Sequence, residues 1–400
     1  MSNYLGSKSY LAMKPETTAG TAVKPTNFCP LVSESIKTIL GLAPDRRMKG
    51  LDWKSDDLLA GDRKHEGDLV IYADADNLGH LLNMTYLKGV TTGDANGYTH
   101  PFTVGLPDSY TIEIQKGPYA QRFFGVRADQ LKLEFVDQKL QATASIKAMG
   151  QFSVSALKEA LSGSVTSLKL SSAYDMKPNT GLAVGDVIVI MGDDGNGVEA
   201  TVSSVNADGE TVGFGAVTVT GAIGNRVYLK AQTPSYTGIA QPLFMGDTLI
   251  GVGADETTAT TNAGAKSTAT GFYQFVVTLK NNLLDAPASG SKDPFQLIPQ
   301  TREAEVTGRR LFEDTTQHIS WLNSIKEAIT MIATGEEITA GGTHESLTLK
   351  LHKVKLTTNE ETLEMDSLIF DTQTFEVLYD SSDGVAVEIS LVNKTAGTSY

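Results

Sequence analysis

The chain has 400 residues, with 33 lysines and arginines against 47 aspartates and glutamates, and its formal net charge is −14. This acidic balance argues against a protein that wraps nucleic acid, because such binding needs lysine and arginine side chains on the phosphates. The single cysteine, Cys29, excludes an internal disulfide, and we expect it to be a small buried apolar residue.

Length and apolar content predict a globular protein of two or three domains. Domains of about 100–200 residues are the norm, and 40% hydrophobic residues are enough for a packed core. No stretch approaches the roughly 18 apolar residues of a membrane helix. Residues 1–10 lack the apolar region of a secretory signal, so we expect the protein to stay in the cytoplasm where it is made.

The first part of the chain combines strand signals with one helix. Strands are predicted at 33–39 and 68–73, separated by a charged segment, 41–67, that shows little periodicity and is expected to be a long loop. The segment 77–88 is expected to be a helix, because its leucines recur on one face. Alternating apolar residues in 110–115, 130–135 and 140–146 then predict strands, the last two as a hairpin with one polar face.

Composition changes between residues 161 and 236. Glycine becomes dense, and short apolar runs are separated by turn-forming pairs such as those in 193–197 and 206–209. Several short strands at even spacing predict a small closed barrel, inserted into the rest of the chain.

The last part repeats the order of elements seen in the first. We expect a loop at 251–271, strands at 273–279 and 304–311 around a proline-containing loop, and then a second helix at 315–333. The expected apolar stripe of that helix consists of Ile319, Leu322, Ile325, Ile329 and Ile332. Alternating strands follow up to residue 392.

The fold prediction is therefore a mainly β protein with an internal duplication, in which each half has one flanking helix. The domain boundaries that follow are 1–160 for the first half, 161–236 for the inserted small β-barrel and 237–400 for the second half.

Segments that resemble catalytic or ligand-binding motifs are incomplete. The stretch 264–268 lacks the glycine that a phosphate-binding loop needs directly before its lysine, and the glycine pairs at 251–253 and 213–215 are better explained as turns. The acidic stretch 193–199 lacks calcium-loop spacing and is expected to be a hairpin turn. The six histidines show no metal-ligand spacing. We therefore expect no enzyme activity, no cofactor and no metal.

Two basic clusters lie beside acidic residues and are expected to form contacts between subunits. One lies in 45–63 and the other at 309–310, and neither has the interleaved aromatics of a nucleic-acid site. The candidate contact residues are Arg46, Arg47, Lys49, Trp53, Lys54, Asp56, Asp57, Arg63, Arg309 and Arg310. Exposed ion pairs contribute only about 0–1 kcal/mol each. Such pairs would therefore determine how the subunits align more than how strongly they bind.

Several short motifs, in order, resemble a large family of phage tail tube proteins. The segment 13–25 contains the Glu-Thr-Thr-x-Gly-Thr sequence that precedes the first tube strand in that family, and 31–37 follows it. Residues 67–71 with the helix around 78–82 are similar to the strand–helix step of the family, and 303–308, 376–381 and 388–393 are similar to its C-terminal half. The resemblance covers about 1–155 and 237–395, and 161–236 departs from it as an added domain.

The resemblance implies a tail-tube β-sandwich or barrel domain and a structural role in the virion. Rings of such domains join their sheets and stack into the hollow tail tube of a long, non-contractile-tailed bacteriophage, a siphovirus, through which DNA is ejected. Because single-domain members form hexamers, a duplicated chain is expected to form a trimeric pseudo-hexamer. The expected partners are other copies, the tape measure protein and DNA in the lumen without specific binding, and the tail terminator and distal tail proteins, with no membrane. The inserted barrel is expected to project outward, as decoration or towards host surface glycans.

Two other functions remain open at this point. The first is another virion structural protein, either a tail terminator or a capsid decoration protein. The second is a glycan-active enzyme, which the low aromatic content of 7% and the presence of only two tryptophans, Trp53 and Trp321, disfavour.

Overall fold

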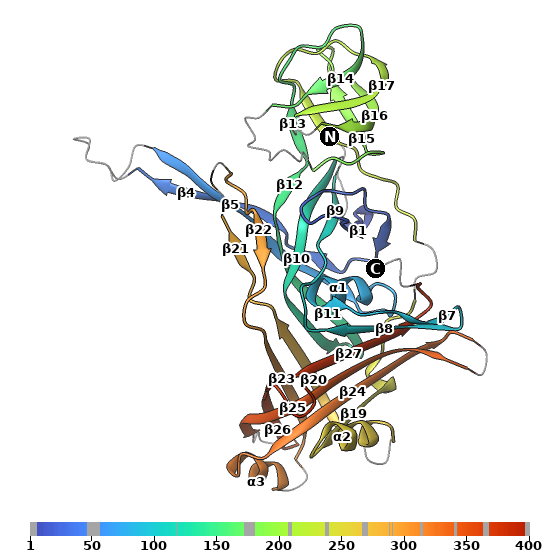
Figure 1. Cartoon of the computed structure of the whole chain (residues 1–400), viewed down its shortest axis with the longest axis vertical. Coiled ribbons are helices and arrows are strands. Elements are labelled where there is room, and N and C mark those ends of the chain that lie inside the picture. Colours follow the sequence, from blue (N-terminus) through green and yellow to red (C-terminus); the bar gives the residue numbers. More distant parts are fainter. Residues whose placement is uncertain are drawn as a thin grey trace.

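The structure is a computed structural model of the whole chain. It describes residues 6–45, 57–117, 119–171, 181–206, 210–236, 240–265, 271–287, 289, 291–312, 315–339, 342–362 and 368–396. The molecule is elongated, with a small sheet at one end of its long axis and helices α2 and α3 at the other (Figure 1). Its secondary structure is mainly β, as predicted. Every helix in the described ranges is too short or too polar to cross a membrane.

Eight antiparallel strands form the central sheet. Their order across the sheet is β4 (Lys37–Pro44), β5 (Leu58–Tyr72), β11 (Lys139–Ala148), β10 (Tyr119–Val136), β20 (Phe272–Lys280), β23 (Glu303–Leu311), β26 (Phe370–Val377) and β25 (His344–Thr362). Strand β10 of the first half thus pairs directly with β20 of the second half. The two halves of the chain therefore share one sheet.

The two faces of this sheet differ in polarity because apolar and polar residues alternate along each strand. In β11 the residues alternate between buried and half-buried along the whole strand. On the buried face, residues such as Leu69, Leu131, Ile146 and Val277 belong to the main hydrophobic core. The other face carries polar and charged side chains.

Helix α1 (Leu78–Thr85) lies within the predicted segment, and all its residues are buried. It begins after Asp74, whose carboxylate accepts hydrogen bonds from the backbone N–H groups of Asp76 and Asn77 at 3.1 and 2.7 Å. The helix packs against β10 and adds Leu78, Leu81 and Leu82 to the core. It therefore covers the apolar face of the first half of the sheet.

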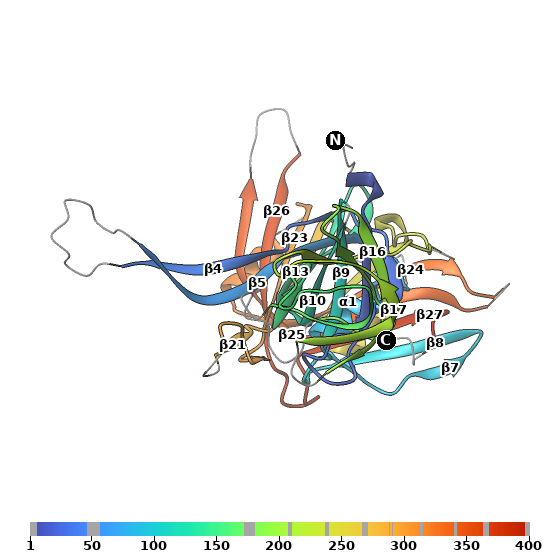
Figure 2. The same ribbon diagram turned by 90° about the horizontal axis from the view of Figure 1, so that it is seen from above.

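The expected long loop at 41–67 is wrong: most of its described residues form a two-stranded arm. Strands β4 and β5 pair from Lys37 with Glu66 to Pro44 with Leu58, and the arm extends away from the body (Figures 1 and 2). Both faces of an extended arm meet solvent, so its sequence need not alternate, which explains why periodicity failed to detect it. Residues 46–56, between the two strands in the sequence, lie outside the described residues.

The expected helix at 315–333 is also wrong in its second half. Helix α3 (Thr316–Leu322) is short, and the chain then turns at Ser324, which has a φ of 53°, into strand β24 (Lys326–Glu337). The β24 sequence is rich in isoleucine and threonine, whose β-branched side chains favour strands. It pairs with β25 on one side and with β19 (Thr248–Gly253) on the other, so Ile329 and Ile332 belong to a sheet.

The segment 251–271 was expected to be a loop, and its glycine pair a turn. Instead, Gly251 and Gly253 lie in β19, and helix α2 (Glu256–Ala263) packs against that strand. A Cβ atom on Gly251 would lie 2.1 Å from the carbonyl oxygen of Ala259, so glycine is what permits the close approach. The pair at 213–215 was also expected to be a turn and lies in β17 (Thr211–Thr218).

The remaining strands of the main body extend this network. Strand β25 also pairs with β27, which pairs with β8, and β8 pairs with β6 and β7. Strand β9 joins β10 to β1, which pairs with β2, while β3 pairs with β5 and β12 with β10. A short separate ladder joins β21 to β22 within the expected loop at 286–303. The bounds are β1 Leu11–Pro15, β2 Asn27–Cys29, β3 Ser33–Glu34, β6 Leu87–Lys88, β7 Thr92–Asp94, β8 Gly97–Thr103, β9 Tyr110–Lys116, β12 Gly150–Phe152, β21 Leu284–Ala286, β22 Gln296–Ile298 and β27 Val387–Asn393.

A second, six-stranded sheet contains most of the segment that was expected to be inserted. Its order is β13-β18-β15-β16-β17-β14, and it has its own hydrophobic cluster. The bounds not yet given are β13 Val154–Ala156, β14 Ser164–Lys169, β15 Val187–Met191, β16 Gly197–Val205 and β18 Arg226–Leu229. The turn expected at 193–197 joins β15 to β16, and an isolated bridge between Leu157 and Leu170 brings the two edge strands together.

Candidate functional site

The central sheet ends in two strands whose outer edges have no partner strand in the described part of the chain. Strand β4 pairs with β5 alone, and residues 356–362 of β25 pair with β26 alone. The β25–β26 pair extends from the body, as the β4–β5 arm does (Figure 2). An unpaired edge offers a row of backbone N–H and C=O groups to another strand, so both ends of the sheet are suited to pairing with another chain.

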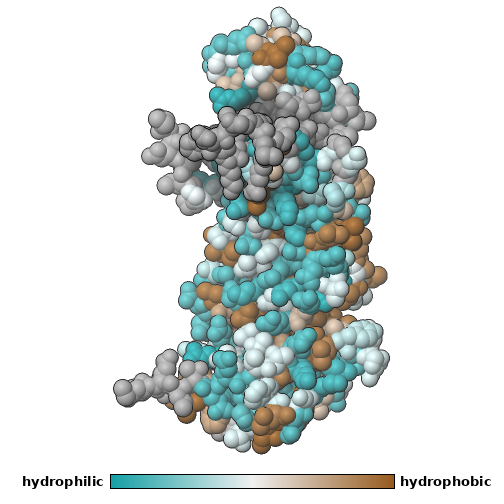
Figure 3. Space-filling model, turned by 90° about the vertical axis from the view of Figure 1, so that its left-hand side faces the viewer, coloured by the Kyte–Doolittle hydropathy of each residue, from teal (hydrophilic) through white to brown (hydrophobic). Residues whose placement is uncertain are grey.

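The β4–β5 arm carries exposed apolar side chains. Leu40, Leu42, Leu58 and Leu59 are between 47% and 58% exposed. Leucines this exposed on a projecting element are expected to be covered by a partner, because leaving them in water forgoes about 25 cal/mol per Å² of apolar area. Elsewhere on the side towards which the arm projects, apolar residues form separate small patches among polar ones (Figure 3).

The polar face of the sheet carries charges of both signs. Lys132 pairs with Glu134 at 2.7 Å, and Lys147 lies 3.6 Å from Asp129. Other charged side chains on this face are Lys37, Glu66, Asp68, Lys280, Glu303, Glu305, Arg309, Glu360 and Glu376, as their strand positions require. Basic side chains interspersed with carboxylates do not form the continuous basic surface that holds nucleic acid.

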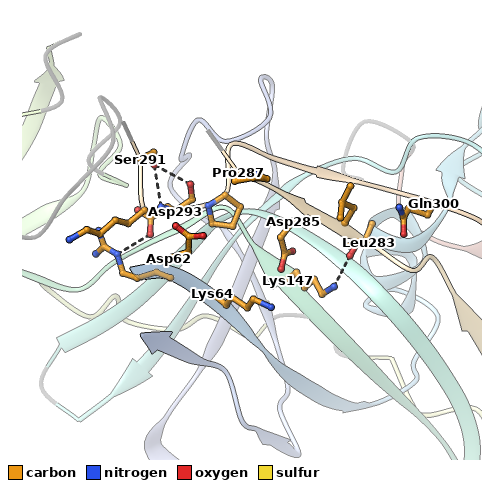
Figure 4. A pocket seen from close by; sticks show the side chains of 13 residues that line it. Asp62, Lys64, Lys147, Leu283, Asp285, Pro287, Ser291, Asp293 and Gln300 are labelled. Carbon is orange, nitrogen blue, oxygen red and sulfur yellow. Dashed lines mark hydrogen bonds and ion pairs between the residues drawn. The ribbon is translucent and has the colours of Figure 1, made fainter. Parts of the chain in front are cut away.

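A pocket of about 360 Å³ lies at the base of the arm, where the β21–β22 segment approaches β5 (Figure 4). The Asp293 carboxylate is 3.2 Å from both the Arg63 Nε atom and the His65 Nε2 atom. Lys147 donates a hydrogen bond to the Leu283 carbonyl at 2.6 Å. These contacts connect two segments of the chain, so the residues that line the pocket anchor the arm to the body.

The predicted contact residues fall into two groups. Arg46, Arg47, Lys49, Trp53, Lys54 and Asp56 lie outside the described residues. Asp57 is exposed at the described limit of the arm, and Arg63 binds Asp293. Arg309 stacks on the Phe370 ring at 4.1 Å, and Arg310 lies 3.9 Å from Asp371. The structure therefore brings Asp57 and Arg63 onto one arm and Arg309 and Arg310 onto one strand, and their role between subunits remains a prediction.

Sequence reasoning missed a buried ion cluster that joins the two sheets. The Arg122 guanidinium is fully buried and binds Glu113 at 2.5 Å and Asp186 at 2.8 Å. The Tyr10 hydroxyl donates to Glu113 at 2.5 Å and accepts from the Gln232 backbone N–H at 2.7 Å. Asp186 directly precedes β15, so this cluster attaches the six-stranded sheet to the main body.

Burial and charge shift the pKa values of Tyr10 and Arg122 further from neutrality. Burial, with the Glu113 charge, raises the pKa of the Tyr10 hydroxyl. Burial opposes the charge on Arg122, but Asp186 and Glu113 overcome it and raise the pKa of the guanidinium. No motif signals such a cluster, since its members are separated along the chain by up to 222 residues. We infer that Arg122 keeps its charge and Tyr10 keeps its proton, and that the cluster is structural.

The side chain of the single cysteine is also buried. Cys29 is fully buried, as expected, and burial raises the pKa of its thiol well above the ordinary value, which disfavours the reactive thiolate. Within the ranges that the structure describes, no three histidine, cysteine, aspartate or glutamate side chains converge as metal ligands.

Buried His80 is expected to make the subunit sensitive to acid. Burial lowers its pKa to about 3, and its Nδ1 atom lies 3.3 Å from the Tyr110 hydroxyl. Because the folded pKa lies below the unfolded value, the unfolded chain gains the proton first as the pH falls through about 6.5 towards 3. His80→Gln should therefore reduce the loss of unfolding free energy between pH 7 and pH 5 by about 2 kcal/mol.

Urea titrations at the two pH values test this expectation. His344→Gln, which alters an exposed histidine, is the matched control and should leave the pH dependence unchanged. An unaltered pH dependence in His80→Gln would contradict the assignment of His80 as the acid-sensitive group.

Two sheet edges that lack a partner strand in the described ranges, together with an arm of exposed leucines, are the features of a self-assembling structural protein. The sequence matches the family model described as phage tail tube protein over residues 6–225, more than half of its 400 residues. The chain belongs to the phage tail tube protein family. It is therefore a structural component of the virion tail and not an enzyme. No curated protein matches the sequence.

The matched range differs from the range in which the resemblance was noticed. It runs on from the first half through residues 161–225, which were expected to depart from the family, and it ends before the second half. The status of 161–236 as an added domain therefore remains a proposal, for which the separate sheet and hydrophobic cluster are the structural support.

Proposed function

We propose that this protein forms closed rings that stack into the hollow tube of a long, non-contractile phage tail, through which DNA leaves the virion. The observation that carries this proposal is the pair of unpaired edges at opposite ends of one sheet. A contact between two different surfaces of identical chains repeats until it closes into a ring or grows into a filament. Closure would leave neither edge open to aggregation.

We assign the polar face of the central sheet to the lumen. Its lysines and arginines alternate with carboxylates, and the chain as a whole carries −14. Phosphate binding gains free energy by releasing counterions from DNA, so a surface without a net basic patch releases few and holds DNA weakly. DNA and the tape measure protein could then occupy the lumen without specific binding.

The exposed leucines of the arm support stacking between rings. An arm that extends beyond the body can reach another ring, and burial of its apolar residues there would stabilise the stack. The tail terminator and distal tail proteins would bind the two ends of such a stack.

Electron microscopy of the purified protein at high concentration tests the proposed function. We expect hollow tubes built of stacked rings. Rings that never stack would instead favour the tail terminator function, and isolated chains under all conditions would contradict self-assembly.

The six-stranded sheet is proposed to decorate the outside of the tube. It lies at one end of the long axis (Figure 1), and residues Ala156 and Arg226 pair at the adjoining ends of β13 and β18. Replacing 157–225 by a two-residue Asn-Gly turn should therefore close these two strands into a hairpin. We expect this deletion variant to form tubes of normal length and smaller outer diameter.

The same microscopy gives the result for the deletion variant. Matched far-ultraviolet circular dichroism should confirm that the shortened chain folds. A folded variant that forms no tubes would show that the six-stranded sheet is part of the assembly contacts.

A further inference from the structure

The central sheet contains the same four-strand unit twice. In the first unit, strands a, b, c and d are β4, β5, β10 and β11, and they lie in the order a-b-d-c. In the second unit they are β20, β23, β25 and β26, and the order across the sheet is the same. All these pairings are antiparallel.

Two local features allow the two units to be aligned residue by residue. Strand β10 has one extra residue, Asp129, in its pairing with β11, and β25 has one extra residue, Thr357, in its pairing with β26. Helix α1 begins six residues after β5 ends at Tyr72, and α3 begins five residues after β23 ends at Leu311. Each β-bulge and each helix thus occupies the same place in its unit, although the side chains differ.

The junction between the two units inside the chain shows how one unit joins the next. Strand c of the first unit pairs with strand a of the second, with Gln130 opposite Lys280 and Glu134 opposite Val276. The Asn281 backbone N–H donates to the Asp129 carbonyl at 2.7 Å. Because hydrogen-bonded and non-hydrogen-bonded pairs alternate along an antiparallel ladder, this bond identifies which residue pairs of the junction exchange backbone hydrogen bonds. The second unit ends in the same kind of strand, β25, and the first begins with β4. In the described ranges, residues 356–362 of β25 and the whole of β4 have no partner strand on their outer edges.

We propose that residues 358–362 of one copy pair with residues 35–39 of the next copy in the register of the internal junction. Aligning the units by their β-bulges and strand pairings places Thr362 opposite Ser35, Glu360 opposite Lys37 and Thr358 opposite Ile39. Opposite charges directly across a strand pair stabilise it, which favours Glu360 with Lys37. This inference rests on the proposed ring, and three copies would supply six units.

Each edge is capped by side chains that must be displaced when the copies join. The Ile36 backbone N–H donates to Glu34 at 2.9 Å, and Lys116 donates to the Ile36 carbonyl at 3.1 Å. The Trp321 indole donates to the Thr357 carbonyl at 3.0 Å. Covering a free edge with side chains is a recognised way to protect it from unwanted pairing, so the free subunit keeps its edges covered until another copy replaces these contacts.

Disulfide cross-linking of assembled tubes tests the register. Lys37 and Glu360 would form a pair without mutual backbone hydrogen bonds, in which Cα atoms lie about 4.5 Å apart, a separation that a disulfide can span. Lys37→Cys combined with Glu360→Cys should therefore cross-link under mild oxidation. The native Cys29 is buried and should not interfere.

Matched controls shift the register by one pleat. Lys37→Cys with Thr362→Cys, and Lys37→Cys with Thr358→Cys, should cross-link at least tenfold less. Ile39→Cys with Thr358→Cys is a second in-register pair that keeps the Lys37–Glu360 contact, in case the first pair prevents folding. Equal or stronger cross-linking by the shifted pairs would overturn the proposed register.

A non-reducing gel also counts the copies in the ring. The ladder of linked chains should end at three for a ring of six units, and a ladder that extends to six would overturn the use of both units in one chain. Tubes that form without either in-register cross-link would refute this inference alone. Failure of the unaltered protein to form tubes would instead refute the proposed function.

Discussion

Arg122→Met is expected to lower the free energy of unfolding by roughly 3–5 kcal/mol, because it leaves two buried carboxylates without a positive partner. Arg122 is fully buried between Glu113 and Asp186, which lie on the main body and next to the six-stranded sheet. Methionine fills similar space, so the loss should come from charge and not from a cavity. Urea denaturation of dilute subunits, followed by circular dichroism, gives the change directly.

Two controls separate a buried charge from any other effect. Lys158→Met removes an exposed partner of Glu210 and should change stability by no more than about 1 kcal/mol. Combining Arg122→Met with Glu113→Gln and Asp186→Asn should cost less than Arg122→Met alone, because no uncompensated carboxylate remains. A triple variant as unstable as the sum of its single variants would contradict this account.

Replacing Leu40, Leu42, Leu58 and Leu59 by serine is expected to raise the protein concentration needed for tube formation by more than tenfold. These leucines are about half exposed in the free subunit, so their replacement should leave the subunit folded. Loss of even 1.4 kcal/mol of contact free energy changes an association constant tenfold, and burial of several leucine side chains exceeds this value.

Light scattering against protein concentration measures the threshold, and electron microscopy identifies the product. The matched control is Val184→Ser with Ile223→Ser, which alters exposed apolar residues of the six-stranded sheet region, 65% and 70% exposed, and should leave the threshold unchanged. Normal tubes from the four-leucine variant at the normal concentration would exclude the arm as a stacking contact.

The two helices predicted from the sequence show where local sequence was sufficient and where it was not. Helix α1 was predictable because its leucines lie on one face and polar residues precede it, and both signals act within a few residues. The segment 326–337 also places apolar residues at helical spacing, yet it is a strand. Its β-branched residues favour strands, and partners more than ten residues away, β19 and β25, decide the outcome.

The candidate site was predictable only in part. The segment around the arm was singled out by its charges, but the two-stranded form of the arm was not predicted, because side chains in solvent on both faces give no alternation. The Arg122 cluster gave no signal, since its carboxylates lie on separate elements.

Local residue pattern was enough for the mainly β class, the position of α1, the polar and apolar faces of strands such as β10 and β11, and the membership in the tail tube family. The pairing of strands, the edges left without a partner strand in the described ranges and the connection between the two sheets became known only from the folded structure. Strand pairing and burial of ions depend on contacts between distant residues, and no local pattern encodes them.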